Sequence, residues 1–150
     1  MPFDRLVQAV DEWAGARSRS DVFAQIGSEG IPPSNIEFTR FLEAAEFKRR
    51  IREADVVISH AGMGTILSAL EAGRPILVMP RLGARRETRN DHQVATARRL
   101  RELGSVAIAM DEPELLEQLD RLERIAAPDA ISPHASGALI GALRDFIAPR

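Results

Sequence analysis

Residues 55–80 read DVVISHAGMGTILSALEAGRPILVMP, and this stretch decides the fold of the 150-residue chain. It opens with consecutive β-branched residues, which predict a buried strand over residues 55–59. A helix is expected over residues 64–72, ended by Gly73 in the position after its last turn. A second apolar run lies between Pro75 and Pro80 and predicts another buried strand. A strand, a helix and a strand in this order predict a parallel βαβ unit.

The same alternation continues on both sides of this unit. Residues 30–35 form a Pro/Gly/Ser loop. Apolar spacing and flanking breakers predict helices over residues 3–14, 44–54, 90–103, 112–125 and 134–147, and strands over residues 21–27, 35–41 and 106–110. We therefore expect a single α/β domain over residues 1–150, with a Rossmann-like, mostly parallel sheet covered by helices on both faces.

Composition excludes several classes of protein. With no cysteine, the chain has no disulfide framework, no thiol catalysis and no Cys-ligated zinc. A net charge of −2 argues against a general nucleic-acid binder. No His-Glu-x-x-His pattern or acidic cluster accompanies the three histidines, so no metal site is predicted. No apolar run could span a bilayer and no signal core opens the chain, so we expect a soluble cytoplasmic protein.

The loop after the first buried strand, residues 59–65 (SHAGMGT), is the strongest candidate for chemistry. Gly62 and Gly64 permit a sharp turn and close approach of a ligand, and the following helix directs free N–H groups outward. Thr65 adds a hydroxyl, and the combination suits a diphosphate. A tight turn that binds nothing is equally consistent with the pattern, and His60 could be structural or could touch the ligand.

Two more loops are expected at the same sheet edge, where open α/β sheets bind ligands. The first follows the strand that ends at Pro80 and carries arginines with a local charge of about +3. This charge suits a solvated loop, a phosphate clamp or a contact with an anionic membrane surface. Helix capping explains Asn90 and Asp91 but does not require His92 or Gln93, which could bind sugar hydroxyls. The other loop holds Phe41, either a core residue or a support for a base.

These residues resemble a known family. The motifs PFDRLVQAVDEWA, DVFAQIG, EADVVISHAGMGTILSALEAGRPILVMPR and NDHQVATARRL are similar to the C-terminal, nucleotide-sugar-binding half of family 28 glycosyltransferases. The similarity is closest to small stand-alone members, such as the soluble subunit of the two-part eukaryotic N-acetylglucosaminyltransferase and PssE-like bacterial subunits, and more distant to MurG. It covers residues 2–103, and HAGMGT followed by NDHQ is a specific pair.

The resemblance implies the donor half of a GT-B glycosyltransferase, which binds a UDP-sugar and transfers a hexosyl group with inversion, without a metal or other cofactor. His60 and His92 are the candidate catalytic residues. The resemblance implies diphosphate contacts from the glycine loop, sugar contacts from the NDHQ motif and uracil contacts from the loop at residue 41. The full set of candidate substrate-binding residues is Phe41, Leu42, His60, Gly62, Met63, Gly64, Thr65, Ser68, Arg81, Asp91, His92 and Gln93.

The chain departs from the family pattern at two places. Ser68 stands where MurG-like relatives carry the acidic residue that holds the ribose, and Glu71, one turn further on, is expected to be a surface charge. Family members also begin with a short apolar strand before the PFDRL helix. Without that strand, we expect a groove between neighbouring strands, with unpaired backbone groups along it. The alternatives are that the natural chain starts upstream of Met1 or that another segment fills the gap.

The resemblance implies the donor-binding subunit of a two-component glycosyltransferase for exopolysaccharide or glycolipid synthesis. A membrane-anchored partner would bind the lipid-linked acceptor and hold this chain at the inner face of the membrane. A second hypothesis is a non-catalytic nucleotide-binding or scaffold module with the same fold. A third is a self-sufficient homodimer, which the presence of one domain makes the least favoured.

Overall fold

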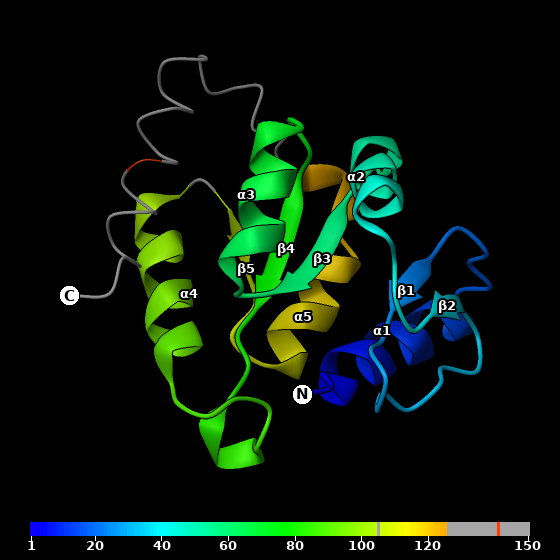
Figure 1. Cartoon of the computed structure of the whole chain (residues 1–150), viewed down its shortest axis with the longest axis horizontal. Coiled ribbons are helices and arrows are strands. Elements are labelled where there is room, and N and C mark those ends of the chain that lie inside the picture. Colours follow the sequence, from blue (N-terminus) through cyan, green and yellow to red (C-terminus); the bar gives the residue numbers. More distant parts are fainter. Residues whose placement is uncertain (105, 126–140, 142–150) are drawn as a thin grey trace.

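The computed structural model describes residues 1–104, 106–125 and 141 (Figure 1). The helix predicted over residues 134–147 lies outside these residues except for Gly141. The described helices are α1 (Asp4–Ala16), α2 (Ala44–Glu53), α3 (Met63–Glu71), α4 (His92–Leu103) and α5 (Glu112–Leu119). The strands are β1 (Phe23–Gln25), β2 (Glu37–Thr39), β3 (Val57–His60), β4 (Ile76–Met79) and β5 (Ala107–Ile108), and short 3₁₀ turns cover Gly83–Arg85 and Leu122–Arg124.

The strands form two separate parallel sheets. In the larger sheet the order is β3-β4-β5, with Val57 opposite Ile76 and Leu77 opposite Ala107. The smaller sheet pairs β1 with β2, with Phe23 opposite Glu37. Figure 1 shows β1 and β2 standing apart from β3. The expected parallel α/β fold is confirmed, and so is the expected break in the sheet.

Helices cover both faces of the larger sheet, as predicted. Every residue of β4 is buried, and its side chains alternate between two apolar cores. Ile76 and Val78 pack among residues of α2, α3 and α4, whereas Leu77 and Met79 pack among residues of α1 and α5. A strand buried on both faces has no polar side, which explains its unbroken apolar sequence.

Two local expectations need correction. Residues 35–41 were expected to form a half-buried strand, but only Ile36 is buried there and the Phe38 side chain is 40% exposed. The helix expected over residues 112–125 ends at Leu119. The helix begins at the predicted residue, where the Asp111 side chain caps it by accepting a hydrogen bond from the Glu114 N–H. The remaining described elements agree with the predicted ones, with shorter strands.

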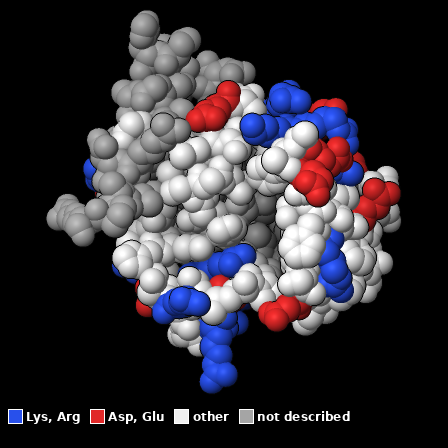
Figure 2. Space-filling view, in the orientation of Figure 1, with Lys and Arg blue, Asp and Glu red and all other residues white. Residues whose placement is uncertain are grey.

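Charge is unevenly distributed over the surface. In Figure 2, basic side chains gather along the lower edge, below the ends of β3 and β4, where the loop after β4 lies. A second charged region lies at the upper right, over α2, where Arg49 pairs with Glu53 at 2.8 Å. Among the residues described, no helix is long and apolar enough to cross a membrane.

Candidate functional site

The glycine loop joins the end of β3 to the start of α3. Gly62 occupies the N-cap position of α3, and no side chain caps that end in the described structure. The first N–H groups of an α-helix have no partner within the helix, so those of Met63, Gly64 and Thr65 remain available to a ligand. A Cβ placed on Gly64 would meet nothing within 4 Å. The helix end therefore faces open space.

Gly62 serves a different purpose from Gly64. A Cβ placed on Gly62 would lie 2.1 Å from Cε1 of His60. The imidazole ring of His60 packs directly against the glycine backbone, and only a residue without a side chain leaves room for it. One glycine of the motif thus positions His60, and the other leaves the helix end open.

Gln93 connects His60 to the loop after β4. Its Oε1 accepts a hydrogen bond from the backbone N–H of Arg81 at 3.0 Å. Its Nε2 lies 3.1 Å from Nδ1 of His60. Because a backbone N–H can only donate, it fixes Oε1 as the acceptor, and Nε2 must then donate to Nδ1. The proton of neutral His60 therefore lies on Nε2, so this ring offers a donor to its surroundings.

The charge state of His60 follows from its surroundings. Burial lowers the pKa of the imidazole, and the nearby positive charge of Arg81 lowers this pKa further. Both causes favour the neutral ring. A neutral His60 with its proton on Nε2 suits a hydrogen bond to a phosphate oxygen better than the removal of a proton.

Arg81 places a half-buried cation at this edge of the sheet. Its side chain is half-buried beside Phe3, with the guanidinium carbon 5.4 Å from the ring centre. Its Nε is buried and has no hydrogen-bond partner within the described part of the chain. Burial lowers the pKa of the Arg81 guanidinium, which nevertheless stays charged. A buried cation with an unused donor indicates a place for an anion.

A buried ion pair holds the backbone on both sides of Arg81. Arg5 donates to Glu87 through Nε at 2.7 Å and Nη2 at 3.0 Å, and Nη2 also donates to the Pro80 carbonyl at 3.1 Å. Glu87 accepts the Leu82 N–H at 2.8 Å. Burial raises the pKa of Glu87, but the bonds from Arg5 and Leu82 outweigh it, so this pKa falls below its ordinary value.

Sequence reasoning missed the role of this pair. Arg5 and Glu87 lie 82 positions apart, and no local pattern connects them. The sequence shows Glu87 only as one negative charge within an arginine-rich loop. Its side chain is 9% exposed, as is that of Arg5. An acidic residue inside an arginine-rich loop was the available signal, because its burial requires a cation as partner.

Several predicted site residues are occupied by contacts within the protein. Ser68 donates its hydroxyl to the Gly64 carbonyl at 2.9 Å, so its proton is already used. Asp91 does not cap α4 with its side chain, contrary to one expectation, but accepts the Gly83 N–H at 3.1 Å. Asn90 accepts the His92 N–H at 3.0 Å instead. His92 is exposed at the start of α4.

The structure brings some of the candidates together and leaves others apart. Leu42, His60, Thr65, Ser68 and Arg81 line one groove. Phe41 is outside that lining, with 67% of its side chain exposed, so the expectation of a core residue is wrong. Glu71 is exposed, as expected.

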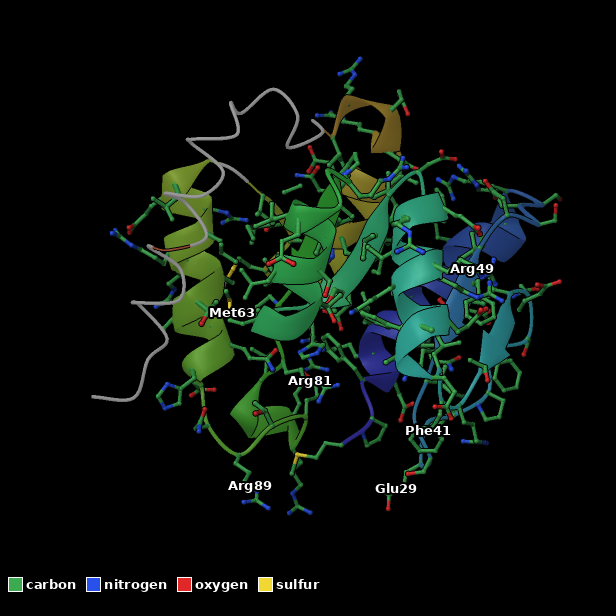
Figure 3. The ribbon with its side chains drawn as sticks, turned by 45° about the horizontal axis from the view of Figure 1, so that its top comes forward. Glu29, Phe41, Arg49, Met63, Arg81 and Arg89 are labelled. Carbon is green, nitrogen blue, oxygen red and sulfur yellow. The ribbon has the colours of Figure 1, made fainter. Side chains whose placement is uncertain are left out.

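The other arginines of the loop after β4 differ from Arg81. Arg85, Arg86 and Arg89 are exposed. Figure 3 shows Arg89 pointing away from the protein, while Arg81 lies beneath the strand ends on the side of Met63. The exposed arginines agree with the expected solvated loop, whereas the phosphate clamp stays a prediction that rests on Arg81. No cluster of metal-ligating side chains occurs among the residues described.

Comparisons with known proteins agree with this architecture. The model of the glycosyltransferase family 28 C-terminal domain matches residues 2–135. Human "UDP-N-acetylglucosamine transferase subunit ALG13" is 34% identical over 85 residues, which are 53% of this chain and 7% of that protein. The UDP-N-acetylglucosamine--N-acetylmuramyl-(pentapeptide) pyrophosphoryl-undecaprenol N-acetylglucosamine transferase of Caulobacter vibrioides is 28% identical over 144 residues, covering 82% of this chain and 38% of that protein.

Solved structures show the same fold. MurG from Acinetobacter baumannii superposes with a TM-score of 0.60 and 19% identity, over 97% of this chain and 47% of that one. The glycotransferase of kitacinnamycin gives a TM-score of 0.56 and 21% identity, over 91% and 33%. The chain spans less than half the length of each of these four relatives. With the family model matching nearly the whole sequence, the chain belongs to glycosyltransferase family 28, as a domain of its C-terminal type.

Proposed function

We propose that this chain binds the UDP-sugar donor of a glycosyl transfer, with the diphosphate at the amino end of α3. The observation that carries this proposal is the unpartnered, buried Nε of Arg81, which lies at the same sheet edge as the open N–H groups of Met63, Gly64 and Thr65. A helix start and a desolvated cation both favour a phosphate group. Family membership and the names of the human and Caulobacter relatives support a UDP-sugar as the ligand.

In the proposed reaction, the protein stabilises the departing UDP. An acceptor hydroxyl oxygen forms a bond to the anomeric carbon while the bond from that carbon to the diphosphate breaks with inversion. Negative charge then develops on the phosphate oxygens, where the helix N–H groups, the Nε2–H of His60 and the Arg81 guanidinium can each interact with it. His60 is a donor in this arrangement, so the base that takes the acceptor proton comes from elsewhere in the assembly.

We further propose that the chain works as the donor-binding subunit of a two-component enzyme. The human relative is named as a subunit of a transferase, which supports this arrangement. The proposed partner is anchored in the membrane and binds a lipid-linked acceptor of exopolysaccharide or glycolipid synthesis. It would hold this chain at the inner face of that membrane.

A non-catalytic binding module is the competing function, and the occupied hydroxyl of Ser68 is the observation that favours it. Reconstituted transfer with the partner subunit, lost in His92→Ala, would exclude that alternative. Sugar transfer by the purified chain alone would instead support a self-sufficient enzyme.

Calorimetric titration of UDP and UDP-sugars onto the purified chain tests the donor site. Arg81→Met should weaken UDP binding by at least tenfold, because it removes the inward cation. Arg89→Met is the matched control: it removes the same charge from the same loop at an exposed position and should leave the Kd within about twofold. Equal effects of the two substitutions, or no binding by the parent chain, would contradict the proposal.

A further inference from the structure

Gln93 connects two segments that reach the site from different parts of the chain. It lies in the first turn of α4, and its side chain contacts both the loop after β4 and the last residue of β3. The amide oxygen accepts the N–H of Arg81 at 3.0 Å, and the amide nitrogen lies 3.1 Å from Nδ1 of His60. Both ends of this amide are therefore used in contacts that shape the candidate site.

The orientation of the Gln93 amide is fixed by the backbone of Arg81. In the opposite orientation, the amide NH₂ group would face the Arg81 N–H, and two donors would meet. The amide oxygen would then accept a hydrogen bond from the His60 ring, a contact that raises the pKa of an imidazole. Because the backbone N–H excludes this orientation, Nδ1 of His60 faces a donor.

The His60 ring is itself held against the glycine loop. A Cβ on Gly62 would lie 2.1 Å from Cε1 of the ring, which shows how closely the imidazole packs there. Nδ1 must accept from Gln93, and a ring nitrogen that accepts a hydrogen bond carries no proton. This excludes both the imidazolium and the neutral form with its proton on Nδ1. The form that remains has its proton on Nε2.

No negative charge beside the ring favours the imidazolium. β4 places the uncharged Met79 opposite His60. The contacts from the glycine loop and from α4 are likewise made by uncharged residues, Gly62 and Gln93. From the loop after β4, the cation of Arg81 disfavours a second positive charge. Within the described part of the chain, His60 forms no ion pair with a carboxylate.

We propose that Gln93 is a positioning residue of the donor site, which holds His60 as a neutral hydrogen-bond donor directed at the diphosphate. The direction of the Nε2–H toward a ligand rests on the proposed function, because His60 and Arg81 line the same groove. The oxygen atoms of a diphosphate accept hydrogen bonds, so an unprotonated Nε2 would repel them. Gln93 keeps this nitrogen protonated, and donor binding near neutral pH then does not depend on the titration of the ring.

Gln93→Glu tests the proposal because it reverses the direction of one hydrogen bond. The new carboxylate still accepts the Arg81 N–H, but toward His60 it accepts where the amide donates. Its negative charge raises the pKa of the imidazole, and the proton that stays on the neutral ring is then the one on Nδ1. As the pH rises through this raised pKa, Nε2 loses its proton, and the contact with the diphosphate becomes repulsive.

The assay is titration with UDP between about pH 6.5 and pH 9. The ratio of the Kd of the variant to that of the parent removes the titration of UDP itself. For Gln93→Glu, this ratio should rise by about tenfold or more across the range. Gln118→Glu adds the same charge in the last turn of α5, away from the site, and should give a constant ratio. A constant ratio for Gln93→Glu would overturn the proposal.

A second readout needs no UDP and separates this proposal from the donor site. In ¹⁵N spectra, the proton of neutral His60 should lie on Nε2 in the parent and on Nδ1 in Gln93→Glu. The same tautomer in both would overturn the role of Gln93. A changed tautomer in a chain that does not bind UDP would support that role and contradict the donor site. If Gln93→Glu does not fold, Gln93→Met removes the donor and should give both tautomers, and a pure Nε2–H form would overturn the proposal.

Discussion

The two glycines of the HAGMGT loop should respond to alanine in opposite ways. In Gly62→Ala the new methyl group would lie 2.1 Å from Cε1 of His60, so the imidazole must move. Its contact with Gln93, now 3.1 Å, is then lost or lengthened. In Gly64→Ala the methyl group would enter open space at the start of α3.

The magnitudes follow from these contacts. Gly62→Ala combines overpacking with a lost hydrogen bond, and we expect a loss of about 2–4 kcal/mol in the free energy of unfolding. That loss corresponds to a Tm lower by about 5–15 °C. Gly64→Ala replaces a glycine within a helix and should raise the stability by about 0.5–1 kcal/mol. Its methyl group would occupy the proposed phosphate position, so the Kd for UDP should rise at least tenfold, or about 1.4 kcal/mol.

Urea unfolding and UDP titration of both variants are the assays. The expected result is that Gly62→Ala is unstable, whereas Gly64→Ala is stable and binds UDP poorly. A Gly64→Ala variant that binds UDP as tightly as the parent would refute the placement of the diphosphate. A Gly62→Ala variant of parental stability would refute the packing of His60 against the loop.

Three further predictions concern polar groups whose contacts hold the described structure in place. Arg5→Met leaves Glu87 buried without its cation and should lower the unfolding free energy by about 3 kcal/mol. Arg49→Met removes the same charge from an exposed ion pair and should have a much smaller effect. Equal losses of stability in chemical denaturation would contradict this prediction. The pKa of His60 is lower in the folded chain than in the unfolded one, so its contribution to stability is present above pH 6.5 and is lost as the pH falls through the folded pKa. His60→Gln should therefore flatten the pH dependence of the urea midpoint over this range. In the parent chain, ¹⁵N spectra should show the proton of neutral His60 on Nε2. The Asp11 carboxylate accepts hydrogen bonds from the three successive backbone N–H groups of residues 34–36 at 2.7–3.1 Å. Asp11→Ala should therefore lower the unfolding free energy by about 3 kcal/mol. An unchanged Tm would contradict this, because it would mean that other groups accept these hydrogen bonds.

Local sequence patterns predicted most of the helices and strands, because these elements depend on residues that are close together in the sequence. The β-branched run at residues 56–58 and the apolar run of β4 predicted two strands, and both are present. β4 is buried throughout, whereas β3 is buried only at Val57 and Ser59. Gly73 adopts a positive φ angle of 67° after α3, as its position at the helix end predicted, and Gly104 does the same after α4, with a φ of 70°. Strands and helix ends of this kind depend on a few neighbouring residues, so a sequence pattern can predict them.

The inner structure of the site depends on contacts that sequence spacing does not encode. The amide of Gln93 lies between the Arg81 backbone and His60, an internal role that its sequence position did not indicate. Its contact with a donor sugar stays a prediction. The Arg5–Glu87 pair joins the first helix to the loop after β4 and could not be read from either segment alone. The exposure of Phe41 also depends on which elements pack beside it, and its aromatic character did not predict this.

The amide spectrum of the ¹⁵N-labelled chain during a titration with UDP tests the central claim most directly. If the diphosphate binds at the start of α3, the backbone signals of Met63, Gly64 and Thr65 and the Nε signal of Arg81 should shift most, with saturation at a common Kd. The exposed guanidinium of Arg89 should stay unchanged and provides the internal control. Saturable shifts confined to other parts of the chain, or no shifts at millimolar UDP, would contradict the assignment of this sheet edge as the donor site.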